Sequence, residues 1–562
     1  MSTGSTKSGK KARAKNRAAE KPIPRREPEA EPVQGIPENA WRIGVILIFL
    51  IAAGLRLYDL DLVPLHHDEG VNGNFLVRLV RERFYQYDPQ NYHGPTLYYF
   101  SALIPWITKI LFGTSASETY GLTTFTVRLI TVLFGIGTIG LVFLLRRKLG
   151  TVATLAAGLM LAVSPGAVYL SRYFIHESLF VFFTLGIVVA AVWFYDERNP
   201  SYLIPAGAST ALLLATKETA MISIGVLIIA LGLTLAYMSI NRKGQGRRYR
   251  EPAGLNRLTE PFGGTTSFIT SILLALLVFW TLYVLFYTSF FTNYKGFWDS
   301  LQTFAIWSKT GREAHVHPPQ QYLIWLARQE SPLLFLGAVG AAMVVLKPKN
   351  SLALFCALWS FGLIAAYSLI PYKTPWLVLN FVVPLALIAG YTIQEIYEMD
   401  HRQLRLASVV LVFAIGIGTY QSIDLNFINY DNDKAKYVYV YAHTTRPTLD
   451  LVNQVEQIAK EHQGGQTGIT IVSPDYWPLP WYFRNFNRVG YFGRMTASSE
   501  PILIANENQK PEIEANFGEL YRQVPSNVAG GSFELRPGVK LLLYVRRSGL
   551  LPPTNPPSIQ NP

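Results

Sequence analysis

An acidic pair, Asp68-Glu69, directly follows the first long apolar run of the chain and is preceded by His66-His67. A carboxylate held near cationic and apolar groups can take a proton from an attacking hydroxyl or amine, so it can act as a general base. Adjacent loop residues usually point in different directions, so we expect one carboxylate to act as the base and the other to orient the reacting groups. The alternative is an ordinary solvated loop.

Three cations, Arg172, Lys217 and Lys373, lie at the ends of three different apolar runs. Such a cluster beside a membrane suits a lipid-linked phosphate, whose charge needs Arg forks or Lys point charges. Glu177 and Glu218 are placed to pair with these cations and to hold their geometry. The alternative for each cation is snorkelling of the charged head toward the membrane interface.

Histidines recur among the same segments, and His315 and His317 would share one face of an extended strand. A divalent metal ion held by His67, Asp68 and His93 is therefore an alternative. The sequence contains no recognised zinc or calcium spacing and establishes no cofactor, so a divalent metal stays an alternative.

The elements that must position these residues are membrane spans. Half of the 562 residues are hydrophobic and 15% are charged, whereas soluble domains carry about a quarter charged residues. One cysteine, Cys356, excludes an internal disulfide framework and a Cys-rich metal site. The excess of basic residues is typical of cytoplasmic loops and is weak evidence for nucleic-acid binding.

The apolar residues form runs of near membrane-spanning length, so we predict a polytopic membrane protein with an all-α membrane domain. We place eleven spans at 41–58, 123–145, 150–170, 178–195, 201–216, 219–240, 267–291, 331–347, 351–370, 376–395 and 404–422.

Basic loops at 146–148, 242–250, 347–349 and 401–405 then fall on one side, together with the basic N-terminal tail. Basic loops face the cytoplasm, so the N-terminus is predicted inside and residues 424–562 outside the plasma membrane. If a further apolar segment, Thr96 to Phe112, also crossed the membrane, either the N-terminal tail or the later basic loops would lie on the wrong side. We therefore predict that it is juxtamembrane or re-entrant.

With this topology, the polar sequences converge on the outer face, where ionisable residues at span ends are functional candidates by default. Besides the acidic pair and the three cations, we expect substrate-binding or orienting roles for His67, His93, His176, Glu177, Glu218 and Tyr372.

Three regions follow from this pattern: a disordered basic cytoplasmic tail (1–40), a transmembrane domain (41–423) and an extracytoplasmic domain (424–562) with a Pro-rich end. The last region is predicted to be α/β, with a loop at 473–482 that suits either sugar binding or packing against the membrane domain. We predict its strands at 469–472, 501–504 and 539–545, and its helices at 450–462 and 516–524.

Several short motifs occur in a fixed order between residues 41 and 495. They are His67-Asp68-Glu69, His93-Gly94-Pro95, Leu111-Phe112-Gly113 with Val127-Arg128-Leu129, Ser164-Pro165 with Ser171-Arg172, Ala215-Thr216-Lys217-Glu218 and Pro371-Tyr372-Lys373-Thr374-Pro375-Trp376. The ordered set resembles GT-C membrane glycosyltransferases, in the dolichyl-phosphate-mannose protein mannosyltransferase and lipid A aminoarabinose transferase group. It is most similar to a prokaryotic branch named for association with flippase activity in archaeal N-glycosylation.

The resemblance implies a polyprenyl-phosphate-linked sugar donor, an external active site and inverting transfer to a protein, lipid or glycan acceptor. By position it assigns the base to Asp68, with Glu69 assisting. In this leading hypothesis the cation cluster of Arg172, Lys217 and Lys373 stabilises the departing donor phosphate. Two alternatives are a flippase or flippase accessory for lipid-linked sugars, and a noncatalytic scaffold. A flippase would need polar residues near the membrane midplane, and the predicted spans carry few charges there.

Overall fold

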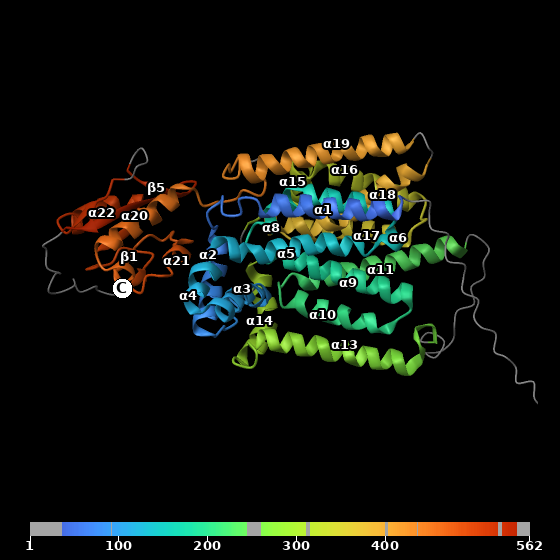
Figure 1. Ribbon diagram of the computed structural model, residues 1–562, viewed down its shortest axis with the longest axis horizontal. Coiled ribbons are helices and arrows are strands. Elements are labelled where there is room, and N and C mark those ends of the chain that lie inside the picture. Colours follow the sequence, from blue (N-terminus) through green and yellow to red (C-terminus); the bar gives the residue numbers. More distant parts are fainter. Residues whose placement is uncertain are drawn as a thin grey trace, which may run out of the picture.

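The computed structural model describes residues 36–91, 93–243, 260–310, 315–399, 403–434, 436–525 and 531–547. These form a long helical bundle with a small α/β domain at one end (Figure 1). Most of the predicted N-terminal tail, most of the basic loop at 242–250 and the Pro-rich C-terminal end lie outside the described residues.

The apolar helices run along the long axis of the bundle (Figure 1). Among the described residues, eight are long and apolar enough to cross a membrane, and two bent pairs raise the number to ten. The shorter α10 (Leu203–Leu214) packs between α9 and α13, so each of the eleven predicted spans coincides with a helix or bent pair. The eight helices are α1 (Glu38–Leu57), α5 (Thr124–Phe143), α9 (Glu177–Glu197), α11 (Ala220–Lys243), α13 (Gly264–Tyr287), α17 (Ser351–Leu369), α18 (Leu379–Glu398) and α19 (Gln403–Ile423).

Each bent pair has a proline in the first turn of its second helix, Pro165 in α8 and Pro332 in α16, and proline lacks the N–H that would continue the first helix. α7 (Thr151–Val163) and α8 (Pro165–Ser171) meet at 60°, and α15 (Gln321–Gln329) and α16 (Ser331–Leu346) meet at 113°. Glu330 lies at the break between α15 and α16 and links it to the break between α7 and α8. Its carboxylate accepts hydrogen bonds from Gly166 N at 2.7 Å and from Ser164 Oγ at 2.9 and 3.0 Å.

The centre of the bundle is α18, which packs against α7, α16 and α17 and is buried almost throughout. A helix that is apolar on nearly all sides suits such a position at the core of a helical bundle. The short helix η4 (Pro375–Val378) precedes α18, and the π-helix η5 (Asp424–Ile428) continues α19.

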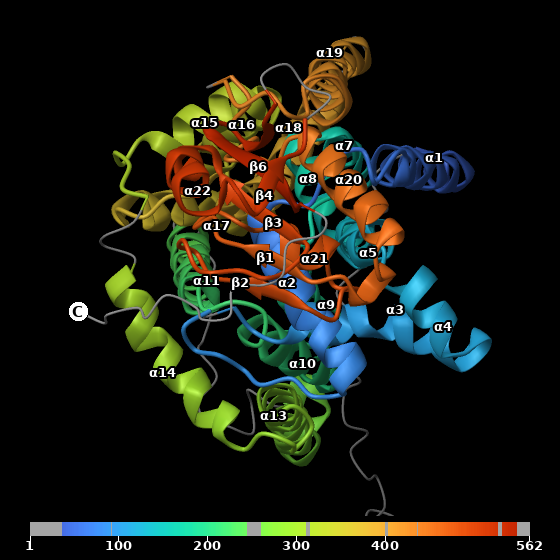
Figure 2. The ribbon, with the colours of Figure 1, turned by 90° about the vertical axis from the view of Figure 1, so that its left-hand side faces the viewer.

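Three helices lie across the bundle at the end that carries the α/β domain, which we call the docking end (Figures 1 and 2). They are α2 (His67–Glu82), α3 (Thr96–Phe112) and α14 (Lys295–Thr310). α3 is the segment predicted to be juxtamembrane or re-entrant. The short helices are α4 (Thr114–Ala116), η1 (Ser117–Gly121), α6 (Arg146–Leu149), η2 (Pro200–Tyr202) and η3 (Glu260–Phe262).

The α/β domain contains a six-stranded mixed sheet in the order β2-β1-β3-β6-β4, with β5 also paired to β6. The predicted α/β character is confirmed, since β1, β3, β6 and α20 lie where strands and a helix were expected. The elements are β1 (Ile469–Ile471), β2 (Val489–Tyr491), β3 (Ile502–Asn506), β4 (Tyr521–Gln523), β5 (Phe533–Arg536), β6 (Val539–Arg546), α20 (Pro447–Glu461), α21 (Leu479–Tyr482), α22 (Lys510–Phe517), η6 (Gly464–Gln466) and η7 (Glu507–Gln509).

The predicted helix at 516–524 is wrong. The helix is α22, which has Pro511 in its first turn and is followed by Gly518. Beyond it, Tyr521 is buried and pairs with Arg546, while Gln523 pairs with Tyr544 in an antiparallel ladder. Cross-strand pairing with β6 therefore overrides the local preference of these residues.

The loop at 473–482 docks the α/β domain onto α2. A Cβ atom at Gly73 would lie 2.6 Å from the Trp481 ring, and one at Gly70 would lie 2.5 Å from Pro478. Such close approach is open only to glycine. The Tyr482 hydroxyl also accepts a hydrogen bond from Leu65 N at 2.9 Å, so most of this loop packs against the membrane domain.

Candidate active site at the docking end

A pocket with a volume of about 260 Å³ opens at the docking end of the bundle. Side chains reach it from α2, from the loop between α2 and α3, from the start of α9, from the α10–α11 loop and from the segment before α18. Trp307 of α14, His315 after it, and Tyr367 and Ile370 at the end of α17 also line the pocket. The pocket therefore gathers residues that lie more than 300 positions apart in the sequence.

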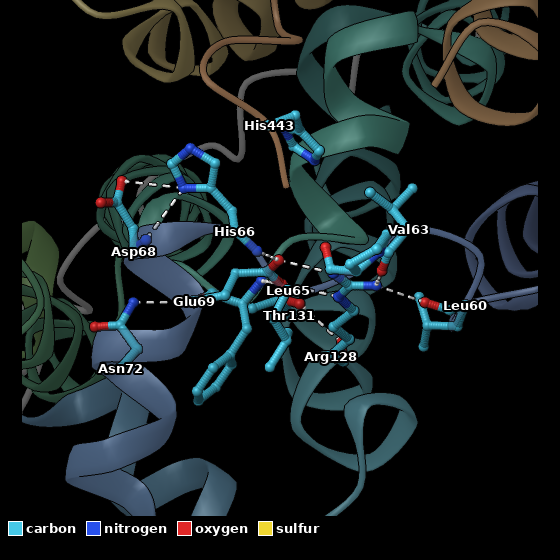
Figure 3. Close-up of polar contacts among 12 residues, drawn as sticks. Leu60, Val63, Leu65, His66, Asp68, Glu69, Asn72, Arg128, Thr131 and His443 are labelled. Carbon is cyan, nitrogen blue, oxygen red and sulfur yellow. Dashed lines mark hydrogen bonds and ion pairs between the residues drawn. The ribbon is translucent and has the colours of Figure 1, made fainter. Parts of the chain in front are cut away.

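Asp68 lines this pocket from the first turn of α2, with 41% of its side chain exposed. His66 caps the helix: its Nδ1 accepts from Asp68 N at 3.1 Å and lies 3.8 Å from Asp68 Oδ2 (Figure 3). The N-terminus of a helix favours a negative side chain, and the exposed carboxylate of Asp68 is open to a reactant.

Glu69 does not line the pocket, and its side chain points toward Arg128 (Figure 3). The Arg128 guanidinium donates to the two carboxylate oxygens of Glu69 at 2.8 and 2.7 Å. The carboxylate also accepts from Phe174 N at 2.7 Å and from His66 N at 3.0 Å. Arg128 in turn donates to the Leu60 and Val63 carbonyls. Glu69 is thus a buried anchor that fixes the start of α2 and the direction of Asp68.

A second charged group comes from the loop between α10 and α11. Lys217 Nζ lies 2.5 Å from Glu177 Oε1, and Glu218 Oε2 lies 3.1 Å from His93 Nδ1. Burial opposes the charged form of Lys217, but the two carboxylates outweigh it and raise its pKa above the ordinary value. Burial likewise opposes ionisation of Glu218, but His93 and Lys217 lower the pKa of this carboxyl. The pocket therefore contains a permanent cation.

The predicted histidines divide between the pocket and its wall. His67 and His93 line the pocket, and burial lowers the pKa of His67, which keeps its ring neutral at pH 7. His176 is fully buried behind them, with Nε2 at 3.0 Å from Gly94 O and its ring centroid 5.0 Å from that of His93.

Two of the three predicted phosphate-binding cations point elsewhere. Arg172 donates to the carbonyls of Arg56, Tyr58 and Asp59, at the C-terminal end of α1, where helix carbonyls lack partners. Lys373 Nζ donates to Ile370 O at 2.5 Å and to His317 O at 3.3 Å.

The structure thus brings one part of the predicted set together and leaves another part outside the pocket lining. The residues brought together are His67, Asp68, His93, Glu177, Lys217, Glu218 and Tyr372, and those outside are Glu69, Arg172, His176 and Lys373.

Sequence analysis gave no role to Arg128, although an arginine within an apolar run is itself a sign of a buried partner. It also gave none to Gln90, Asn91 and Trp307, which line the pocket. These three lie in a polar loop and on an amphipathic helix, where their types are ordinary and carry no signal.

Metal ligation by His67, Asp68 and His93 was an alternative from the sequence. In the described part of the chain, no group of three or more His, Cys, Asp or Glu side chains is arranged to hold a metal ion.

Comparisons with known proteins agree on the fold. A family model described as dolichyl-phosphate-mannose-protein mannosyltransferase matches residues 101–246. The chain is similar to the structure of ArnT from Cupriavidus metallidurans bound to undecaprenyl phosphate, with 13% identity and a TM-score of 0.56 over 90% of this chain and 98% of that one. It is also similar to the Archaeoglobus fulgidus oligosaccharyltransferase tethered with an acceptor peptide, with 13% identity and a TM-score of 0.50 over 81% of this chain and 64% of that one.

No curated protein sequence matches significantly. The chain has the fold of GT-C membrane glycosyltransferases, and this sequence-based expectation is confirmed.

Proposed function

We propose that this chain is a membrane glycosyltransferase that moves a sugar from a polyprenyl-phosphate-linked donor to an acceptor outside the cytoplasm. The observation that carries this proposal is the pocket at the docking end, where the exposed carboxylate of Asp68 and the cation of Lys217 share one lining. A likeness in fold to a structure bound to undecaprenyl phosphate supports a lipid-phosphate donor.

In this mechanism, Asp68 accepts the proton of the acceptor hydroxyl or amine as it attacks the anomeric carbon. The bond between that carbon and the phosphate oxygen breaks, and the electron pair leaves with the lipid phosphate. A single displacement inverts the anomeric centre. Lys217 stabilises the negative charge that develops on the departing phosphate, which is the usual role of a preorganised cation in a shielded site.

The remaining pocket residues orient these two groups. Glu177 holds Lys217 through its short ion pair, and Glu218 holds His93. His67 and Tyr372 line the walls and suit contacts with the donor sugar or the acceptor.

The predicted site residues outside the pocket act at a distance in this proposal. Arg172 fixes the end of α1 that leads to α2, Lys373 fixes the segment before α18, and Glu69 fixes α2 itself. His176 supports the His93 side of the pocket from behind.

The sidedness rests on the basic loops. Arg146–Leu149 forms α6 at the end of the bundle opposite the docking end (Figure 1). Asn350, which follows the basic loop at 347–349, donates to Lys148 O there, and Arg146 pairs with Glu38 at the start of α1. Basic loops face the cytoplasm, so we place the pocket and the α/β domain outside the plasma membrane.

Cysteine labelling tests this sidedness. In a Cys356→Ala background, a membrane-impermeant maleimide should label Glu461→Cys in intact cells, because α20 carries it on an exposed surface. The same reagent should label Arg147→Cys only after the cells are opened, since this side chain is 82% exposed at the basic end. Labelling of Arg147→Cys in intact cells would invert the topology.

A flippase remains the alternative from the sequence, and the position of the pocket favours the enzyme. Transporters hold their substrates near the bilayer midplane between repeats, whereas this pocket lies at one end of the bundle. The purified protein should be placed in liposomes with a defined polyprenyl-phosphate sugar and a mixture of candidate acceptors. Sugar transfer without translocation of the donor supports the enzyme, and translocation without transfer supports the flippase.

The role of Lys217 can be tested by donor binding. Lys217→Met with Glu177→Gln removes both charges of the ion pair, and Glu218 keeps its contact with His93. Loss of a charge-assisted contact should weaken binding of a polyprenyl-phosphate sugar by about ten- to a hundredfold.

Lys373→Met is the matched control, because it removes a buried lysine that donates to the Ile370 and His317 carbonyls and does not line the pocket. Donor affinity should change little in this variant. An equal loss in both variants would show that general distortion, and not a phosphate contact, weakens binding.

A further inference from the structure

A second cavity lies on the flank of the bundle near the docking end, between α15, α19 and the segment that leads to the α/β domain. Its volume is about 560 Å³, and it shares no lining residue with the candidate active site. We call it the flank groove. It is lined by Arg328, Gln329, Val412, Phe413, Gly416, Ile417, Tyr420, Gln421, Asp424 and Lys436.

The wall formed by α19 is apolar and open. Val412 is 71% exposed, Phe413 70% and Tyr420 66%. Gly416 lies between them in sequence, and a Cβ atom at this position would meet nothing within 4 Å. In a bilayer these side chains face hydrocarbon, so this part of the groove fits an acyl chain.

The end of the groove nearest the α/β domain is charged. Arg328 is exposed in the last turn of α15, and the side chain of Lys436 is 66% exposed. Lys436 Nζ lies 3.1 Å from Asp424 Oδ2, and Asp424 also accepts from Asn429 at 2.5 Å. Two cations and one carboxylate leave this end with one net positive charge.

A hydrogen-bond acceptor also remains at this end. Gln421 donates through Nε2 to Arg328 O at 3.1 Å, while its Oε1 is buried with no partner among the residues that the structure describes. Buried acceptors are nearly always satisfied by protein, water or ligand. The chain next leaves the α-helical form in the π-helix at Asp424–Ile428, and such irregular turns are frequent at functional sites.

We propose that the flank groove binds an anionic glycerophospholipid with a hydroxylated headgroup, from the leaflet on the docking side. The phosphodiester carries one negative charge, which Arg328 and Lys436 match in excess over Asp424. A headgroup hydroxyl can donate to Gln421 Oε1, and one acyl chain lies along Gly416. A polyprenyl monophosphate fits less well, because it carries nearly two charges and has no hydroxyl-bearing headgroup beyond the phosphate.

The bound lipid would also brace the connection between the two domains. Lys436 belongs to the segment that joins α19 to the α/β domain, and the next residues reach back to α15. Val438 N donates to Gln329 Oε1 at 3.4 Å, and the Tyr439 hydroxyl donates to Glu330 at 3.3 Å. A headgroup that contacts both Arg328 and Lys436 would likewise link α15 to the segment between α19 and the α/β domain.

Native mass spectrometry of the full-length detergent-purified protein tests the site, with phosphatidylglycerol as the probe. The wild type should retain the lipid. Gly416→Leu should fill the acyl part of the groove, and Arg328→Gln with Lys436→Gln should remove the phosphate contacts. Each should lower retention by about ten- to a hundredfold.

Two controls match these changes in type. Gly232→Leu adds the same side chain on the exposed face of α11, where a Cβ also meets nothing within 4 Å. Lys434→Gln removes an exposed cation two positions from Lys436. Both controls should retain phosphatidylglycerol like the wild type.

Equal loss in the controls and the groove variants would reduce the contact to ordinary annular lipid and overturn the proposal. Equal retention of phosphatidylcholine would remove the headgroup selectivity that the charges and Gln421 imply. Displacement of phosphatidylglycerol by an equimolar amount of undecaprenyl phosphate would assign the groove to the other lipid phosphate. None of these outcomes depends on sugar transfer, so the flank groove and the proposed function can fail separately.

Discussion

Asp68→Asn is expected to lower the rate of sugar transfer by about 10²–10⁴-fold, which is the usual loss when a positioned base is removed. The amide keeps the size of the side chain and can still accept from neighbours, but it cannot take the acceptor's proton at neutral pH. Donor affinity should change little, because the proposed contact of Asp68 is with the acceptor. The measurement is initial-rate transfer in liposomes, with donor binding determined on the same preparation.

Asp61→Asn is the matched control, since Asp61 is an exposed acid in the segment that leads to α2 and does not line the pocket. Its transfer rate should equal that of the wild type. Transfer at the wild-type rate by Asp68→Asn would end the base assignment. The flippase would be supported instead if neither the wild type nor Asp68→Asn transfers sugar and Asp68→Asn loses translocation of the donor.

The positions of the spans could be predicted because the bilayer imposes a length on every apolar run. The gathering of His93, Lys217 and Glu218 also follows from the sequence, since span ends on one side of a membrane must share one surface. A count of crossings and the distribution of basic loops were sufficient for that step, and no side-chain detail was needed.

The direction of each side chain could not be predicted in this way. Arg172 and Lys217 both lie just beyond the end of a span, yet Arg172 turns to the carbonyls at the end of α1 while Lys217 faces the pocket. The difference depends on which helix end lies beside each cation. Which helix ends lie side by side is decided by the packing of the whole bundle, and it cannot be predicted from a single sequence.

The directions of Asp68 and Glu69, in contrast, could have been predicted from a local rule for how helices begin. Glu69 accepts from His66 N while the His66 ring accepts from Asp68 N, so the two side chains form a reciprocal cap at the start of α2. Once this helix start is recognised, successive residues point about 100° apart. One carboxylate then faces the pocket and the other faces the bundle.

The ion pair between Glu69 and Arg128 leads to the second large expected effect. Both side chains are buried, with 0% and 2% exposed. Arg128→Met would leave the Glu69 carboxylate buried without its countercharge, which typically costs about 3–5 kcal/mol. We therefore expect a clear fall in thermal stability in detergent, together with loss of transfer, because the same contact fixes the start of α2.

A double variant separates the charge from the space that the arginine fills. Arg128→Met with Glu69→Gln removes both charges, so it should recover a substantial part of the stability that Arg128→Met loses. Arg78→Met is the control on α2, since its pair with Glu82 is more than half exposed and should contribute no more than about 1 kcal/mol. If the double variant is as unstable as Arg128→Met, the arginine acts mainly through its bonds to the Leu60 and Val63 carbonyls. In that case the loop before α2, and not the acidic residue, is the part of the structure that Arg128 holds in place.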